Sequence, residues 1–188
     1  MPDARLPGGL DSMRPVVDLG SAPFVFMTTG VPCHSEREDE MGSIVTQVDI
    51  ARGPEEVFNY VTDPAHFTEW QENVTGGHMD GPTTVGSKCV TNRRIGGSER
   101  EVTSEVTVLD PPRAWAVHGT NGPIRSRVNV TVEPLRDSTS SKVTIDLDFE
   151  GHGIGKLLVP LLVRHQSRRE MRRNMTRLKA RLESPAGS

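Results

Sequence analysis

The chain has 188 residues, a formal net charge of −3 and a hydrophobic content of 34%. This length suits one domain with a sizeable core, and the small net charge excludes an overall polyanion-binding signature. The charge is unevenly spread, because residues 153–188 carry nine Lys+Arg and two Asp+Glu, giving +7 and leaving −10 for the remainder. The 18 glycines and 14 prolines indicate that part of the chain does not pack.

The sequence shows no pattern typical of a metal site, a cofactor site or a membrane anchor. Cys33 and Cys89 fit neither a CxxC pattern nor a Cys/His ligand spacing, so we expect no disulfide and no metal. The glycine pairs do not follow nucleotide-binding spacing, and no cofactor is expected. There is no apolar run of about 18 residues and no signal-peptide pattern, so a cytoplasmic location is the expectation.

Residues 1–42 differ in composition from the rest of the chain. Five prolines and the charged run of residues 36–40 interrupt them, which predicts a disordered tail. Alternatively, Met41 is the natural start of the protein and the preceding residues come from an upstream start codon. With either interpretation, the folded domain is expected to span residues 43–184, followed by a short tail of residues 185–188.

The domain is predicted to begin with a strand over residues 44–51, where apolar side chains alternate with polar ones. Residues 53–61 are predicted to form a short helix, because Pro54 suits its first position and two glutamates follow at its positive end. A second helical turn is predicted over residues 65–70, ending in a tryptophan.

Six further strands are predicted, separated by turns rich in glycine and proline. They cover residues 73–80, 86–95, 98–109, 114–120, 125–133 and 141–151. In the third of these, Val102, Val106 and Val108 are expected to share one face. The last shows the cleanest alternation, with apolar side chains on one face and mostly acidic ones on the other. This pattern indicates an antiparallel sheet that is solvated on one side.

A long amphipathic helix is predicted for residues 153–183, because apolar side chains return every three or four residues. Its stripe comprises Ile154, Leu157, Leu161, Met171, Met175, Leu178 and Leu182. The stripe is interrupted at Arg164 and Arg168, with His165 beside them. Either these groups form a polar spot on the inner side, or Pro160 shifts the register so that the arginines face water.

Together these elements predict an α+β protein in which one long C-terminal helix lies across a curved antiparallel sheet. Helices can cover only one face of this sheet, so the other face meets water. A bent sheet that closes on a single helix leaves a central hollow, which is a common kind of ligand site.

Several stretches resemble a known family. Val48–Ala51 and Gly53–Pro64, followed by Phe67–Trp70, are similar to the opening of the START-like superfamily in its polyketide cyclase/dehydrase-like (SRPBCC) branch. Val108–Arg113 resembles the mid-sheet turn of that branch, and Leu178–Glu183 is similar to its ending.

This resemblance covers residues 42–183. It implies a helix-grip fold, in which the sheet wraps around the C-terminal helix and two short helices follow the first strand, with a deep, mostly apolar cavity. Members of the family bind or transport lipids, sterols and polyketides, and some catalyse cyclisation or dehydration. No catalytic signature is shared across the family, so the resemblance assigns no catalytic residue.

Strand alternation and the helix stripe predict the residues that face the cavity. They are Trp70, Val106, Trp115, Val128, Val130, Leu147, Phe149, Leu158, Leu161 and His165. A single bulge would invert the assignment within a strand. A carrier needs an apolar lining, whereas a cyclase or dehydratase needs a proton acceptor near a ketone and a donor for the enolate oxygen. His165, Arg168 and His118 are the candidates for such catalysis.

The expected partner is a hydrophobic small molecule, lipid-like or polyketide-like. The helix also carries a basic face that would suit an anionic membrane or an acidic partner. This face consists of Arg169, Arg172, Arg173, Arg177 and Arg181. Because no aromatic side chain accompanies it for base stacking, nucleic acid is not expected, and membrane contact is at most peripheral. A monomer and a homodimer fit the sequence equally well.

Overall fold

The elements follow one another in the predicted order. The computed structural model describes residues 43–122, 124–135, 138–151 and 164–184. The elements are β1 (Ile44–Ile50), α1 (Pro54–Thr62), the 3-10 turn η1 (Pro64–His66), α2 (Phe67–Trp70), β2 (Val74–Asp80), β3 (Lys88–Ile95), β4 (Ser98–Asp110), β5 (Ala114–Gly119), β6 (Ile124–Pro134), β7 (Ser141–Gly151) and α4 (Arg164–Glu183). The predicted tails and residues 153–163 of the predicted helix lie outside the described residues.

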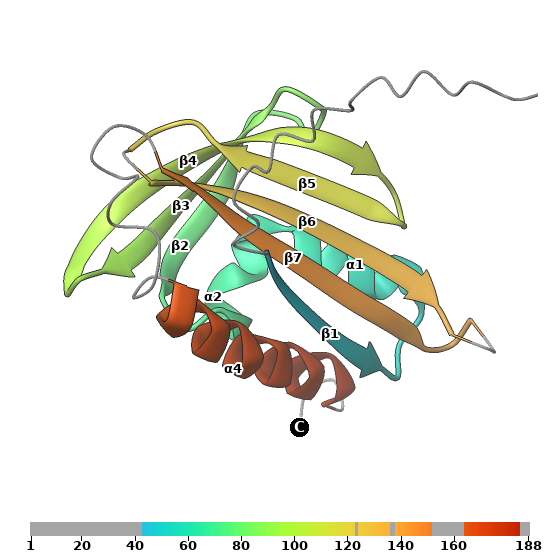
Figure 1. The fold of residues 1–188 in the computed structure, drawn as a ribbon. Helices are drawn as coiled ribbons and strands as arrows, with labels where there is room; N and C mark the ends of the chain where they lie inside the picture. Colours follow the sequence, from blue (N-terminus) through green and yellow to red (C-terminus); the bar gives the residue numbers. More distant parts are fainter. Residues whose placement is uncertain (1–42, 123, 136–137, 152–163, 185–188) are drawn as a thin grey trace, which may run out of the picture. The chain divides into compact units, whose positions relative to one another are not determined.

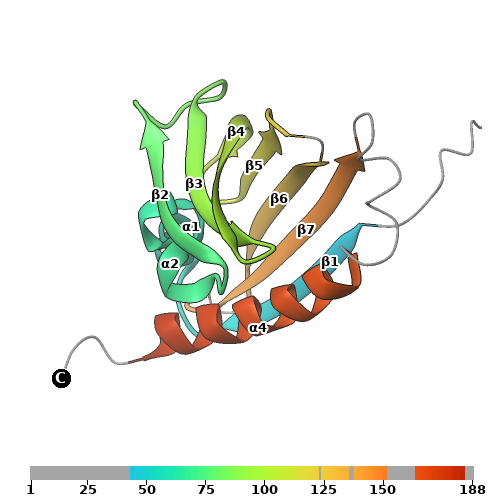
Figure 2. The same ribbon diagram turned by 90° about the vertical axis from the view of Figure 1, so that its left-hand side faces the viewer.

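The seven strands form one antiparallel sheet in the order β1-β7-β6-β5-β4-β3-β2. From β2 to β7 each strand pairs with its neighbour along the chain, whereas β1 pairs with β7. Ile44 lies opposite Leu147, and Ile50 lies opposite Ser141. The sheet curves so that β2 and β3 stand on one side of the interior and β7 and β1 on the other (Figures 1 and 2). This confirms the predicted curved sheet.

The helices lie within the curve of the sheet and supply the other half of the core. In α1, Pro54 occupies the first turn, and the buried side chains are Val57, Phe58 and Val61. The helix α1 contacts β6, α2 contacts β2, and α4 contacts both β1 and α2 (Figure 2). The long C-terminal helix therefore packs against the first strand of the domain and closes one side of the interior.

The described part of the predicted helix stripe is confirmed. Met171, Met175, Leu178 and Leu182 are all buried. Asn174 is also buried on this helix, and its side-chain oxygen accepts a hydrogen bond of 3.0 Å from the backbone N–H of Glu72. This polar contact ties α4 to the residues that follow α2.

The prediction that Val108 shares one face of β4 with Val106 is wrong. Val106 is fully buried opposite Val117, but Val108 is 42% exposed. A register shift between these two valines places Val108 opposite Ala116. One extra residue in a bulge reverses the direction of the side chains that follow it, which turns Val108 outward.

Candidate functional site

The inner face of the sheet, which the helices cover, is apolar across β4 to β7. The fully buried side chains on it include Val106, Val130, Val132, Val143 and Ile145. Further along β6 and β7, Val128, Leu147 and Phe149 are only half-buried and pack against this core. The inner face therefore changes from a closed core to a partly open apolar surface.

Strand register brings most of the predicted ligand-binding residues together. Trp115 lies opposite Val130, and Val128 lies between Val117 and Leu147 on the neighbouring strands. The inward-facing residues were predicted for each strand separately, and the pairing of β5, β6 and β7 joins them into one continuous apolar surface.

The short helix α2 adds an aromatic cluster to this surface. Trp70 and Trp115 are each 3% exposed. The ring of Phe67 meets Trp70 edge to face at 5.8 Å and Trp115 at 6.3 Å between ring centroids. Edge-to-face contacts of this kind add to the stabilisation from burial. The cluster fixes α2 against β5.

One charged side chain points to the same face and was not singled out from the sequence. Arg93 follows Cys89 and Thr91 in the alternation of β3, and both of those are buried. Its Nε donates to Thr91 Oγ1 at 3.3 Å, and one terminal nitrogen donates to Gln71 Oε1 at 2.9 Å. Burial lowers the pKa of Arg93, while the negative charge of Glu170 opposes that shift.

The alternation of Cys89, Thr91 and Arg93 was a signal that could have identified this arginine. Both of its acceptors are neutral, and no ion pair with a carboxylate of the described residues is present. The positive charge of Arg93 is therefore not neutralised by a carboxylate among the described residues. Arg93 lies close to the aromatic cluster, because its partner Gln71 directly follows Trp70.

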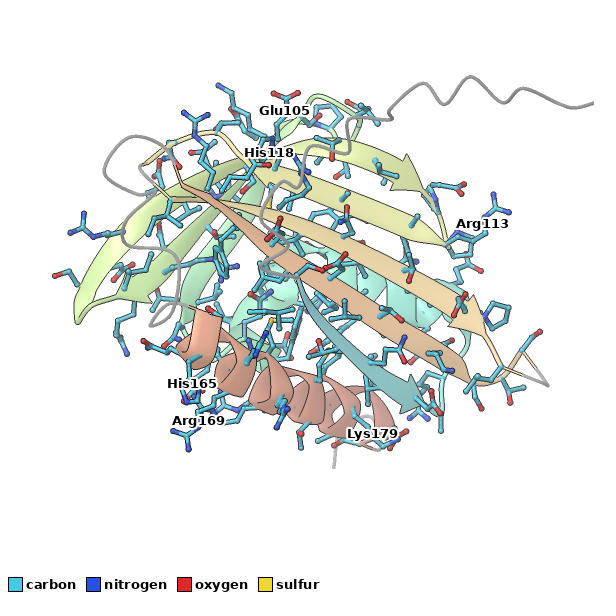
Figure 3. All side chains as sticks on the ribbon, viewed as in Figure 1. Glu105, Arg113, His118, His165, Arg169 and Lys179 are labelled. Atoms are coloured by element: carbon cyan, nitrogen blue, oxygen red, sulfur yellow. The ribbon has the colours of Figure 1, made fainter. Side chains whose placement is uncertain are left out.

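The structure does not bring the catalytic candidates together. His118 faces away from the helices, and its Nε2 lies 3.3 Å from Glu150 Oε2, while the other oxygen of that carboxylate pairs with Arg127. His165 and Arg168 are exposed on α4. Figure 3 shows His118 and His165 well apart, on β5 and α4. Of the other predicted positions, Leu158 and Leu161 lie outside the described residues, as does the side chain of Arg164.

A groove of about 440 Å³ lies between the edge strand and the C-terminal helix. Residues 45–48 of β1 form one wall, and Arg172, Met175, Thr176 and Lys179 of α4 form the other. None of these residues is a predicted ligand-binding residue. The groove belongs to the outer margin of the sheet rather than to its inner face.

The basic face of α4 is partly used within the domain. Arg173 Nε lies 2.6 Å from Glu72 Oε2, and Arg181 pairs with Glu69 at 3.1 Å. No helix in the described ranges is long and apolar enough to cross a bilayer. Within the same ranges, no three His, Cys, Asp or Glu side chains are grouped so as to hold a metal ion.

Comparison with known families gives one match. A family model described as polyketide cyclase/dehydrase and lipid transport matches residues 41–183. This match confirms the resemblance predicted from the sequence. No curated protein matches the chain.

Comparison with solved structures gives the same fold at low identity. A START superfamily protein from Mycobacterium smegmatis has a TM-score of 0.62 and 17% identity, covering 76% of this chain and 98% of that one. The Zhui aromatase/cyclase from Streptomyces sp. R1128 has a TM-score of 0.65 and 12% identity, covering 76% and 93%. The major latex-like protein 151 of Panax ginseng has a TM-score of 0.59 and 17% identity, covering 76% and 98%.

Proposed function

Because the chain belongs to the polyketide cyclase/dehydrase and lipid transport family, whose members bind hydrophobic ligands or act as polyketide cyclases, we propose that it binds a hydrophobic small molecule, lipid-like or polyketide-like. The proposed site is the inner face of the sheet on the side closed by α4. The observation that carries the proposal is the half-buried apolar surface of Val128, Leu147 and Phe149. Covering such a surface with an apolar ligand removes it from water, which is favourable.

Binding without turnover fits the described inner face better than acid–base catalysis. General acid–base catalysis needs a proton donor and a proton acceptor within reach of the same substrate. Arg93 supplies a permanent positive charge, but the histidine candidates lie elsewhere. Burial raises the pKa of the Cys89 thiol to about 11, so this group stays protonated at neutral pH and is a poor nucleophile.

A role in docking to membranes has less support. Two of the five arginines on the basic face of α4 already pair with Glu69 and Glu72 of the domain itself. These ion pairs hold α4 against the region of α2, and they reduce the charge that remains for an external partner.

The direct test is native mass spectrometry of the protein purified from its own host. A co-purifying compound of apolar character is the expected result. In parallel, the uncharged dye N-phenylnaphthylamine, which fluoresces in apolar surroundings, is titrated into the purified protein. Saturable fluorescence that a lipid or an aromatic polyketide displaces supports the proposal, and absence of any saturable binding contradicts it.

A matched pair of variants tests whether the dye binds at the inner face. Val128→Phe adds a bulky ring to the half-buried surface, and it should weaken dye binding by about tenfold or more, since the same space cannot hold both. Val108→Phe makes the same change on a strand position that is 42% exposed, and it should leave dye binding unchanged. Equal effects of the two variants would place the dye elsewhere.

A further inference from the structure

The first strand of the domain has backbone groups on its outer edge that β7 cannot satisfy. β1 lies at one edge of the sheet, pairs with β7 on one side and has α4 beside it (Figures 1 and 2). In an antiparallel pair, alternate residues direct their N–H and C=O groups towards the partner strand or away from it. The backbone oxygen of Asp49 accepts a hydrogen bond from Lys179 of α4, which places Asp49 in the outward set. Val45 and Gln47 alternate in step with Asp49, so their backbone groups also point away from β7.

These outward groups open onto the groove between β1 and α4. Val45 and Gln47 both line it, and their outward N–H and C=O groups have no hydrogen-bond partner in the described part of the chain. Further along β1, side chains of α4 bond to the backbone and cover the edge. Proteins usually protect an edge strand with charges, proline or a covering segment, because its free groups readily pair with another strand. Residues 44–48 carry no charge and no proline, and Val45 is 55% exposed.

The α4 wall of the groove carries positive charge that the described domain does not neutralise. Arg172 lines the groove, is exposed and has no ion pair with a described residue. Arg168 lies four residues earlier on the same side of the helix, and it is likewise exposed and unpaired within the described ranges. Lys179, the other basic residue of this wall, is bonded to Glu183. The described residues that line the groove include no acid, so its charge favours an acidic occupant.

We propose that this groove is a docking site for an extended acidic peptide segment of a partner protein, which adds a strand to the sheet at β1. The peptide backbone pairs with Val45 and Gln47, and acidic side chains on its α4 side meet Arg172. Strand addition takes affinity from backbone hydrogen bonds and specificity from the neighbouring side chains. A second copy of this chain fits less well, because pairing two β1 edges brings two basic walls together. The site is separate from the inner face and does not depend on ligand binding there.

The first test compares two peptides of opposite charge. The probe is a fluorescein-labelled octapeptide of alternating threonine and aspartate, and its counterpart carries lysine in place of aspartate. Fluorescence anisotropy at low ionic strength should show saturable binding of the acidic peptide and about tenfold weaker binding, or none, of the basic one. Equal affinity for the two peptides, or no saturable binding of the acidic one, would overturn the proposal.

A pair of variants at one position tests the backbone pairing. Proline is tolerated on an edge strand where the N–H faces outward, so Gln47→Pro removes one outward donor while β1 stays paired with β7. Gln47→Ala changes the side chain and keeps the N–H. The first should weaken binding of the acidic peptide about tenfold or more, and the second should change it less than about twofold. Circular dichroism checks that both variants are folded.

Amide hydrogen exchange of the unmodified protein gives the same test without a substitution. The N–H groups of Val45 and Gln47 should exchange more slowly when the acidic peptide is bound. Unchanged exchange at both positions would refute strand addition. A dimer that protects these two N–H groups in the absence of peptide would make a second copy the occupant, and the acidic-peptide proposal would then be wrong.

A matched pair of charge reversals tests the basic wall. Arg172→Glu acts inside the groove, whereas Arg177→Glu acts on an exposed residue of α4 that does not line it. The first should weaken binding of the acidic peptide about tenfold or more, and the second less than about threefold. Equal effects would indicate general attraction to a basic helix and overturn the docking site. Both variants should bind N-phenylnaphthylamine as the unmodified protein does, which separates this site from the inner face.

Discussion

Glu183, at the end of α4, accepts a hydrogen bond of 2.8 Å from the backbone N–H of Ala51, the residue that follows β1. The same carboxylate oxygen accepts a hydrogen bond from Lys179 Nζ, which also donates to the backbone oxygen of Asp49. The hydrogen bond from Lys179 and, to a smaller extent, the one from Ala51 hold the pKa of Glu183 below its ordinary value. The helix therefore satisfies backbone groups at the free edge of the sheet.

We predict that Glu183→Gln lowers the free energy of unfolding by about 1 kcal/mol at neutral pH, because it removes a charge-assisted hydrogen bond. The folded-state pKa lies below the unfolded one, so the contribution is present above the unfolded pKa and is lost as pH falls through the folded pKa. Urea unfolding near neutral pH and again in strong acid measures the difference, which should vanish in acid.

The exposed Glu101 of β4 provides the control for that measurement. Glu101→Gln removes a carboxylate of the same charge without an α4 contact, so it should change stability by less than about 0.5 kcal/mol. Equal effects of the two substitutions would mean that the contact between α4 and β1 contributes nothing specific.

A close approach of backbone segments makes Gly77 of β2 sensitive to substitution. A Cβ atom at this position would lie 2.7 Å from the backbone oxygen of Pro64 in η1. We expect Gly77→Ala to destabilise the protein by about 1–3 kcal/mol, because β2 and η1 must move apart. At Gly76 the nearest atom would be Asn92 Nδ2 at 3.6 Å, an ordinary contact. Thermal unfolding of Gly77→Ala and Gly76→Ala should therefore show a clear loss only in the first.

The bulge in β4 is tested by two valines of similar sequence context. Val106→Ala should cost about 2 kcal/mol, since it removes two methyl groups from a fully buried position. Val108→Ala should cost less than about 0.5 kcal/mol, since the side chain is 42% exposed and loses far less buried area. Chemical denaturation of both variants is the measurement, and a larger loss at Val108 would contradict the register.

Tyr60 is the single tyrosine of the chain, which makes its ionisation directly measurable. Its ring stacks on His66 at 4.6 Å, and its hydroxyl group donates to Glu69 at 3.2 Å. Burial first, and then the negative charge of Glu69, raise the pKa of Tyr60 to about 12. Ultraviolet absorbance titration should give this value. In Glu69→Gln it should fall towards the ordinary 10.0 without reaching it, because burial remains.

A titration of the unmodified protein that gives the ordinary tyrosine value would show that Tyr60 is neither buried nor bonded to Glu69. An unchanged value in Glu69→Gln would assign the whole shift to burial.

The alternation of apolar and polar residues along β7 predicted its inner face correctly. In a strand with one buried face, every second side chain points to the core, so the sequence repeats with a period of two residues. Val108 was assigned to the wrong face, because the position of a bulge depends on the partner strand and leaves no local mark in the sequence. The alternation of β3 could have placed Arg93 on the inner face, whereas its hydrogen bond to Gln71, 22 residues away in the sequence, could not be predicted from that alternation.

Pairing of β1 with β7 and α4 has a consequence for biosynthesis. The contacts of β1 reach across 99 residues to Ile145 and 130 residues to Lys179. Both partners leave the ribosome long after β1 does. The nascent domain therefore carries its first strand unpaired until the rest of the domain, as far as α4, has been synthesised.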